Sequence, residues 1–264
     1  MAACQKKSKL LPDAATVNTD EISASSRHHE EEEETASGNK HVYTLSNQVS
    51  GNTVMDYQRA SNGILTFNAS CAAGGTGTGG GLGNQGAVVL DEEGEVLLAV
   101  NPGSNSISSF KVTGNGLNLK STVSSGGIKP VSITINDDIV YVLNAGGNGN
   151  ISGFKLGNNE MLTPIANSTR PLSSSAAAAA QISFVNEGNV VVITERATNK
   201  IITYTINEWG VPGAMHSITS STPTPFGFDA VAMEIFLYRK PQVVLPVPVN
   251  FLLIVCIIMV LSLC

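Results

Sequence analysis

The sequence predicts an all-β protein, a β-propeller built from four-stranded blades. Short runs rich in β-branched and aromatic residues recur along the chain, each bounded by Gly, Asn, Asp or Ser. One aromatic residue marks each repeat, and these residues are 53, 44 and 50 positions apart: Tyr57, Phe110, Phe154 and Tyr204. No helical pattern interrupts the repeats. Four short strands in every unit of about 40–50 residues are typical of a propeller blade.

Composition excludes several classes of function. Only 14% of the 264 residues are charged and the formal net charge is −6, which excludes a basic surface that binds nucleic acid. The four cysteines include no C-x-x-C pair and are widely scattered, which excludes a zinc ribbon and a disulfide scaffold. We therefore expect no nucleic-acid partner, no metal and no cofactor.

The strands are expected in a fixed order within each repeat. A first β-rich run ends at polar turn residues, in residues 42–47, 97–101, 140–144 and 191–195. A second run follows, in residues 54–57, 107–110, 151–154 and 201–204. A third run comes after a hairpin signal, as in residues 117–123. A fourth run precedes the next unit, in residues 86–90, 131–135 and 181–184. This order gives about three complete units after an incomplete leading one.

The N-terminal segment, residues 1–39, is expected to be disordered, because its polar and acidic composition cannot bury enough apolar surface. His28 and His29 precede an acidic run, which we interpret as a solvated linker. The small residues before Cys4 resemble the end of a bacterial lipoprotein signal, and a lipid on Cys4 would anchor the chain to a membrane surface. The alternative is that Cys4 is an ordinary residue of this terminus.

The repeats resemble a known family. Four segments are similar to the lactonase-type seven-bladed propellers, which are related to cycloisomerase-type 6-phosphogluconolactonases and carboxymuconate lactonizing enzymes: residues 74–83, 124–127, 144–154 and 194–201. The resemblance also implies a repeat of the YVTN type. The resemblance covers a partial propeller over residues 40–229 and implies seven blades, of which about three to four are present.

The C-terminal tail, residues 230–264, has two interpretations. It is uncharged from Val243 onward and reaches the ~20 residues of a spanning helix, although Pro246 and Pro248 interrupt it. It is then a transmembrane segment. In the other interpretation, a frameshift near residues 229–232 makes the tail out-of-frame translation. If the Tyr238 codon ends in T and each codon from Arg239 to Pro248 ends in G, the frame shifted by two bases reads Ser-Glu-Ala and then small residues, as the family resemblance implies.

Glu195 and Arg196 are the candidate catalytic residues. Glu195 ends a first run at the place where other repeats carry Asn101 and Asn144. Equivalent positions are expected at one mouth of the central channel, where a carboxylate acts as acid or base and an arginine holds a substrate carboxylate. The alternative is that these groups hydrogen-bond neighbouring blades together. Because side chains alternate along a strand, Glu195 and Arg196 should point to opposite faces.

The remaining motifs carry no chemistry. A G-x-G-x-x-G match at Gly75, Gly77 and Gly80 is followed by a strand pattern rather than a helix, so we interpret it as a loop between strands. His41 and His216 are isolated, and there is no G-x-S-x-G motif.

The family resemblance implies a function in lactone chemistry. We expect lactone hydrolysis or cycloisomerisation in the intact ring, with a small lactone or sugar acid as substrate, and an inactive chain if the ring is incomplete. The alternative is a non-catalytic propeller that binds a glycan or a protein. A bacterial cell envelope or secreted location is expected, with membrane association through the Cys4 lipid or the tail.

Overall fold

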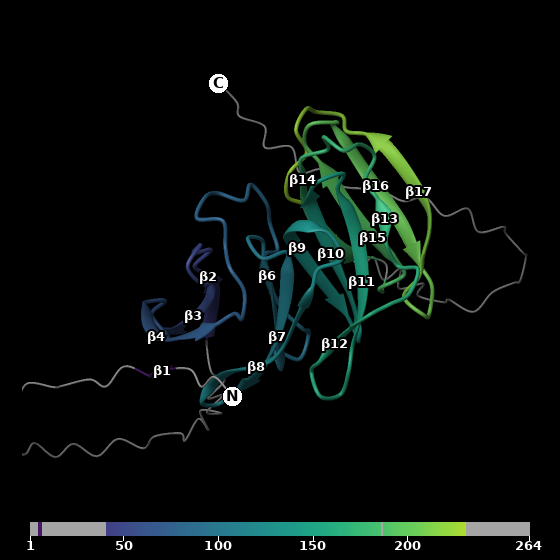
Figure 1. Ribbon diagram of the computed structural model, residues 1–264. Coiled ribbons are helices and arrows are strands. Elements are labelled where there is room, and N and C mark those ends of the chain that lie inside the picture. Colours follow the sequence, from purple (N-terminus) through teal and green to yellow (C-terminus); the bar gives the residue numbers. More distant parts are fainter. Residues whose placement is uncertain (1–4, 7–40, 186, 231–264) are drawn as a thin grey trace, which may run out of the picture.

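The computed structural model describes residues 5–6, 41–185 and 187–230, which form four antiparallel sheets (Figure 1). The first sheet has the order β1-β4-β3-β2, from β1 (Gln5–Lys6), β2 (His41–Leu45), β3 (Thr53–Arg59) and β4 (Leu65–Ala72). The second runs β5-β6-β7-β8, from β5 (Val88–Leu90), β6 (Val96–Asn101), β7 (Ser106–Thr113) and β8 (Gly116–Ser124).

The third and fourth sheets repeat this plan. The third runs β9-β10-β11-β12, from β9 (Ile128–Asn136), β10 (Ile139–Gly146), β11 (Asn150–Leu156) and β12 (Leu162–Pro164), and β13 (Arg170–Pro171) also pairs with β11. The fourth runs β14-β15-β16-β17, from β14 (Ala179–Val185), β15 (Val190–Glu195), β16 (Lys200–Ile206) and β17 (Pro212–Thr219). These sheets are the predicted blades: three complete ones follow an incomplete leading one.

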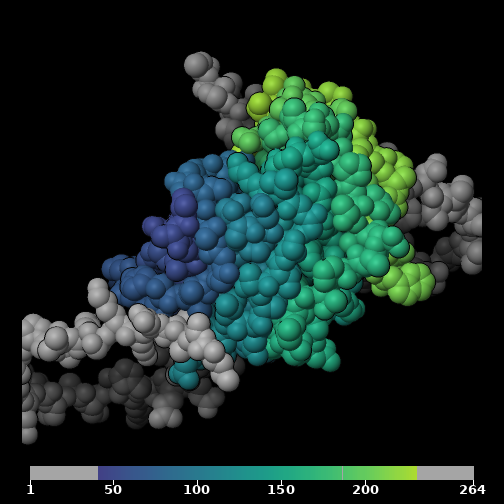
Figure 2. All heavy atoms as spheres, viewed as in Figure 1, coloured from purple at the N-terminus to yellow at the C-terminus, as the bar shows by residue number. Residues whose placement is uncertain are grey.

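The blades lie side by side in chain order (Figure 2), and apolar side chains of neighbouring blades pack against each other. The first strands of neighbouring blades lie together, β9 between β5 and β14. Backbone amides join them: Ile182 N donates to Ser132 Oγ at 3.1 Å and Phe184 N donates to Thr134 Oγ1 at 3.1 Å. These inner strands therefore form one side of an arc of blades, and the hairpins β7–β8, β11–β12 and β16–β17 form the other.

The core lies between the blades. Alternation along β6 sends Leu97 and Ala99 against the first blade, and Leu98 and Val100 against the third, so every residue of β6 is buried. Of the four aromatic residues that mark the repeats, Phe110, Phe154 and Tyr204 are buried against the preceding blade. Their equivalent Tyr57 is only half-buried and packs edge-on against Phe67, with ring centroids 5.8 Å apart.

The expected disordered N-terminal segment, the candidate lipidation site and the apolar tail all lie at the ends of the chain. Gln5–Lys6 pairs with the outer edge of β4, within the segment expected to be disordered. Cys4, residues 7–40 and residues 231–264 lie outside the described residues. In the part of the chain that the structure describes, no helix is long and apolar enough to cross a membrane.

Candidate functional site

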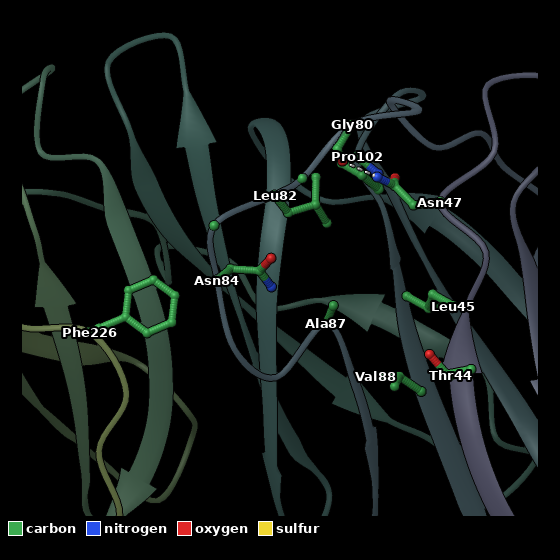
Figure 3. A pocket seen from close by; sticks show the side chains of 12 residues that line it. Thr44, Leu45, Asn47, Gly80, Leu82, Asn84, Ala87, Val88, Pro102 and Phe226 are labelled. Atoms are coloured by element: carbon green, nitrogen blue, oxygen red, sulfur yellow. Dashed lines mark hydrogen bonds between the residues drawn. The ribbon is translucent and has the colours of Figure 1, made fainter.

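An open pocket of about 390 Å³ lies where the connection between the first two blades passes the inner side of the arc. The edge strand β2 and the start of the second blade form one part of its wall, and the Gly-rich connection forms another. Figure 3 shows Phe226 at the opposite end of the pocket from Thr44 and Leu45, with Leu82 and Asn84 between them. The lining mixes apolar side chains with a few polar groups, which is typical of a site for a small organic ligand.

Asn47 holds the Gly-rich connection in place. Its Nδ2 donates to Thr78 Oγ1 at 3.1 Å and to Gly80 O at 2.7 Å, and its Oδ1 accepts from Thr78 N at 2.9 Å. A Cβ atom on Gly77 would lie 2.1 Å from the backbone of Asn47, so only glycine allows this approach. The connection is therefore a loop between strands, as the sequence predicts, and it has a fixed path.

Arg196 lies at the rim of the pocket. Its Nε donates to the carbonyl oxygen of Ala178 at 3.0 Å, and its guanidinium carbon lies 5.5 Å from the ring centroid of Phe226. The terminal guanidinium nitrogens approach Gly83, another lining residue. The backbone contact and the cation–π contact fix the guanidinium, and none of the described residues forms an ion pair with it. A positive charge is thus available beside the pocket.

Glu195 has no exposed surface, and its carboxylate is fully engaged. Its Oε1 accepts from Ser173 N at 2.8 Å, and its Oε2 accepts from Ser173 Oγ and from Thr198 Oγ1. The structure therefore separates Glu195 from Arg196, as alternation along the strand predicts. The contacts support the alternative role, in which Glu195 joins neighbouring blades; its catalytic role stays a prediction.

Asn101 and Asn144, like Glu195, form hydrogen bonds with the connection that enters their blade, although they donate where Glu195 accepts. Asn144 Nδ2 donates to Ser125 O at 3.0 Å, and Asn101 Nδ2 approaches Ala73 O at 3.4 Å. Each acceptor belongs to the connection that enters the blade from the preceding one. All three side chains are fully buried, so these equivalent positions link each blade to its incoming connection and do not face the pocket.

The two histidines lie elsewhere. His41 Nδ1 lies 2.6 Å from Asp56 Oδ1, and the buried Asp56 also accepts from Asn68 Nδ2 at 2.7 Å. His216 is exposed on the outer strand β17. Within the described residues, no three His, Cys, Asp or Glu side chains gather as metal ligands.

Sequence reasoning missed most of the pocket. Leu82, Asn84 and Phe226 were not singled out, because their proximity depends on how three blades are placed. Asn47 was accessible to sequence reasoning, since it ends the first run of its repeat as Asn101 and Asn144 end theirs.

Four-stranded antiparallel blades packed face to face define a protein of the β-propeller class. The family model described as "Lactonase, 7-bladed beta-propeller" matches residues 3–168, which is more than half of the chain. The chain belongs to this family. A search of curated protein sequences gave no significant match.

Solved structures with the same fold include a protein from Lactobacillus plantarum, at TM-score 0.56 and 14% identity, which covers 72% of this chain and 56% of that one. The periplasmic gluconolactonase of Pseudomonas aeruginosa has TM-score 0.55 at 14% identity, and the match covers 70% of this chain and 56% of that one. A Bacteroides fragilis protein provisionally assigned as a 6-phosphogluconolactonase has TM-score 0.55 at 14% identity, and the match covers 69% of this chain and 55% of that one. The matched part of this chain thus spans a little over half the length of these structures.

Proposed function

We propose that this chain binds a lactone or sugar acid in the pocket beside Arg196 and takes part in hydrolysis of the lactone. The observation that carries the proposal is the guanidinium of Arg196, which is held at the rim of the pocket and forms no ion pair with any described residue. Family membership supports it, and so does the gluconolactonase assignment of one similar structure.

In this reaction Arg196 would stabilise negative charge on the substrate and the product. In lactone hydrolysis the oxygen of water bonds to the carbonyl carbon, the ring C–O bond breaks, and the proton released by water reaches the departing ring oxygen. Negative charge develops on the carbonyl oxygen in the tetrahedral intermediate and passes to the ring oxygen as the ring C–O bond breaks and that oxygen takes the proton. The product carboxylic acid then releases the second proton of water to solvent and becomes a carboxylate. The outer N–H groups of Arg196 can donate to the carbonyl oxygen and then hold the carboxylate. Asn84 and Leu82 lie where they would contact the rest of the ligand.

The test follows the loss of glucono-δ-lactone and of its 6-phosphate in a pH-stat, with subtraction of the uncatalysed rate. Removal of one donor to a developing oxyanion costs about 100-fold in rate, so Arg196→Ala should reduce kcat/KM by that order. Arg196→Lys should recover part of it. Arg59→Ala, at an exposed arginine at the end of β3, should match the unmodified chain.

Two results would contradict the proposal. One is a wild-type rate equal to the uncatalysed rate together with no lactone or aldonate binding by calorimetry. The other is equal activity in the Arg196→Ala and Arg59→Ala variants. Binding without turnover would instead support the non-catalytic alternative for this chain.

We further propose a cell-envelope location. The similar structure from Pseudomonas aeruginosa is that of a periplasmic protein, which supports this proposal, as does the lipoprotein-like sequence around Cys4. Expression of the gene with its upstream sequence, in a bacterium supplied with radiolabelled palmitate, tests the second point: label on the unmodified chain and none on Cys4→Ser is expected. No label on either would overturn the lipidation of Cys4.

A further inference from the structure

The pocket beside Arg196 has two chemically different ends. Phe226 and the guanidinium of Arg196 form one end, which carries a positive charge. Figure 3 shows Leu45, Ala87 and Val88 around a common space at the other end, away from Phe226. The described residues that line this second end have no charged side chain. A ligand that fills the pocket therefore needs a polar or anionic group at one end and an apolar group at the other.

Paired strands hold the apolar end in place. Leu45 lies opposite Val54 in the β2–β3 pair, and Val88 lies opposite Ala99 in the β5–β6 pair. Leu45 and Ala87 also pack against the core shared by the second and third blades. This wall is thus formed before any ligand binds, so little conformational entropy is lost when an apolar group lies against it.

Two further side chains extend the apolar surface toward the middle of the pocket. Pro102 follows β6 and is buried, and Leu82 is half-buried in the Gly-rich connection. Figure 3 shows Leu82 between the two ends. Each methylene group that leaves water for such a surface raises affinity about four-fold. The surface therefore favours a ligand with several methylene groups.

The side chains of the lining offer few free hydrogen-bonding groups. The amide of Asn47 is engaged within the Gly-rich connection through both its nitrogen and its oxygen. The Nδ2 atom of Asn84 donates to Val131 O, which leaves its Oδ1 as an acceptor for a ligand. Thr44 adds one hydroxyl. Glucono-δ-lactone carries four hydroxyl groups, more than these side chains can pair, and a hydroxyl that leaves water without a partner costs free energy.

We propose that the pocket selects a γ- or δ-lactone with an alkyl substituent on the carbon next to the ring oxygen. The proposal rests on the proposed binding of a lactone beside Arg196. With the carbonyl group at Arg196, the ring lies beside Leu82 and Asn84, and the alkyl chain extends toward Ala87 and Val88. The volume of about 390 Å³ is within the range of pockets for small organic ligands.

Hydrolysis of such a lactone gives a hydroxy fatty acid whose groups match the same positions. Water adds its oxygen to the acyl carbon and a proton to the ring oxygen, which becomes the hydroxyl of the product. The carboxylic acid releases its proton to solvent, and the carboxylate can accept from the guanidinium of Arg196. The new hydroxyl can donate to Asn84 Oδ1, and the chain stays on the apolar wall.

Two lactones that differ only in the substituent test the preference with the full-length chain. δ-Valerolactone has no substituent, and δ-nonalactone has a butyl group. Rates are measured in a pH-stat with subtraction of the uncatalysed rate. Because each buried methylene contributes about four-fold, even partial burial of the butyl group should raise kcat/KM at least about ten-fold. Calorimetry should likewise show that 5-hydroxynonanoate binds more tightly than gluconate.

Two substitutions of nearly equal volume test the apolar wall itself. Val88→Thr replaces a methyl group with a hydroxyl and should lower kcat/KM for δ-nonalactone about five-fold, with little change for δ-valerolactone. Thr44→Val makes the opposite change and should raise the preference for δ-nonalactone. Both keep a β-branched side chain, which suits a strand. Val42→Thr is the matched control, because Val42 is exposed on β2 and does not line the pocket, and it should match the unmodified chain.

Parallel measurements on Arg196→Ala separate this proposal from lactone hydrolysis. Equal kcat/KM for the two lactones, with turnover that still depends on Arg196, would overturn the alkyl preference and leave hydrolysis intact. Binding of 5-hydroxynonanoate that weakens in Val88→Thr, without turnover, would support the apolar end and overturn hydrolysis. Tighter binding of gluconate than of 5-hydroxynonanoate would overturn the alkyl preference and assign the pocket to polyhydroxy acids. No turnover of either lactone and no binding of either carboxylate would overturn both proposals.

Discussion

Glu195 and Asn144 occupy the same place in successive blades, yet one is a carboxylate and the other an amide. The donors around them account for Glu195. Ser173 and Thr198 direct three donor groups at the carboxylate. A carboxylate suits these donors because both of its oxygens accept hydrogen bonds, whereas an amide has only one acceptor oxygen. Asn144 instead donates to a carbonyl, and its Oδ1 has no partner among the described residues.

Substitution of Glu195 should therefore separate structural from catalytic roles. Glu195→Ala leaves buried donors without an acceptor and should lower the free energy of unfolding by about 3 kcal/mol. Glu195→Gln keeps one acceptor oxygen, and hydroxyls can rotate to accept from its amide, so a loss of about 1 kcal/mol is expected. Urea unfolding measures both, with the exposed Glu95→Ala as control. If Glu195→Gln is stable but loses all lactone turnover, the catalytic role is supported and the purely structural role is wrong.

The buried tyrosines predict how stability depends on pH. Tyr204 donates its hydroxyl to the carbonyl oxygen of Pro171, and burial, opposed in part by the charge of Arg170, raises its pKa to about 12. The pKa of Tyr141, which donates to Gly210 O at 2.7 Å, is also raised by burial. A tyrosine in an unfolded chain ionises near pH ~10. The stability that these tyrosines contribute is thus complete below that pH and is lost above it.

Thermal melting at increasing alkaline pH tests this. We expect the Tm of the unmodified chain to fall between pH ~10 and pH 12, the folded-state pKa of Tyr204. Tyr204→Phe cannot ionise at this position and should show a shallower fall, from a slightly lower Tm at neutral pH because the hydrogen bond to Pro171 is lost. Parallel pH profiles for the two proteins would show that Tyr204 does not set the alkaline limit.

At the scale of elements, the connections between blades are held by polar side chains at strand ends. Asn101 is fully buried, and it also accepts from Asn52 Nδ2 at 3.0 Å and donates to Ser108 Oγ at 2.8 Å. Asn47 is only half-buried, and its partners Thr78 and Gly80 lie in an exposed part of the connection. Asn101 thus secures the start of the connection between β4 and β5, and Asn47 secures its middle, in different surroundings.

This difference predicts different effects of one substitution. Asn101→Ala leaves buried partners unsatisfied and should cost about 2–3 kcal/mol of global stability. Asn47→Ala should cost less than about 1 kcal/mol, since water replaces its contacts, but should speed amide exchange in residues 76–80. Hydrogen exchange with mass spectrometry, combined with urea unfolding, measures both. Faster exchange in every blade of Asn47→Ala would contradict this local role.

The strand order was accessible to sequence reasoning because each strand carries its own signal. Residues 131–135 and 181–184 lie within β9 and β14, and residues 86–90 contain β5. The surroundings of Glu195 could not be predicted from the sequence. A polar residue after an apolar run fits a position that faces the central channel, and it fits equally a buried position that hydrogen-bonds the incoming connection. Its partner Ser173 follows β13, in a connection whose path no periodic pattern predicts. The pocket likewise depends on Phe226 and Leu82, which come together only when the blades are stacked.

At the scale of the whole molecule, the free energy of folding comes from faces shared between blades. Each interior blade buries both faces, so its loss would expose two apolar surfaces at once. The first blade shares one face with the second. Its other face carries Val42, Leu65 and Phe67, which are 38%, 48% and 46% exposed. Apolar side chains gathered on an open sheet face favour self-association.

Phe67→Thr should therefore lower self-association more than other exposed apolar positions do. Thr keeps a high preference for strands, so the expected cost is the edge contact with Tyr57, about 1 kcal/mol. Trp209→Thr is the matched control, because Trp209 is 69% exposed in the turn between β16 and β17, away from this face. Light scattering across a concentration series should give a smaller apparent mass for Phe67→Thr than for the unmodified chain and for Trp209→Thr. Equal masses for all three proteins would show that the open face of the first blade does not drive association, and a decrease only in Trp209→Thr would assign it to the turn instead.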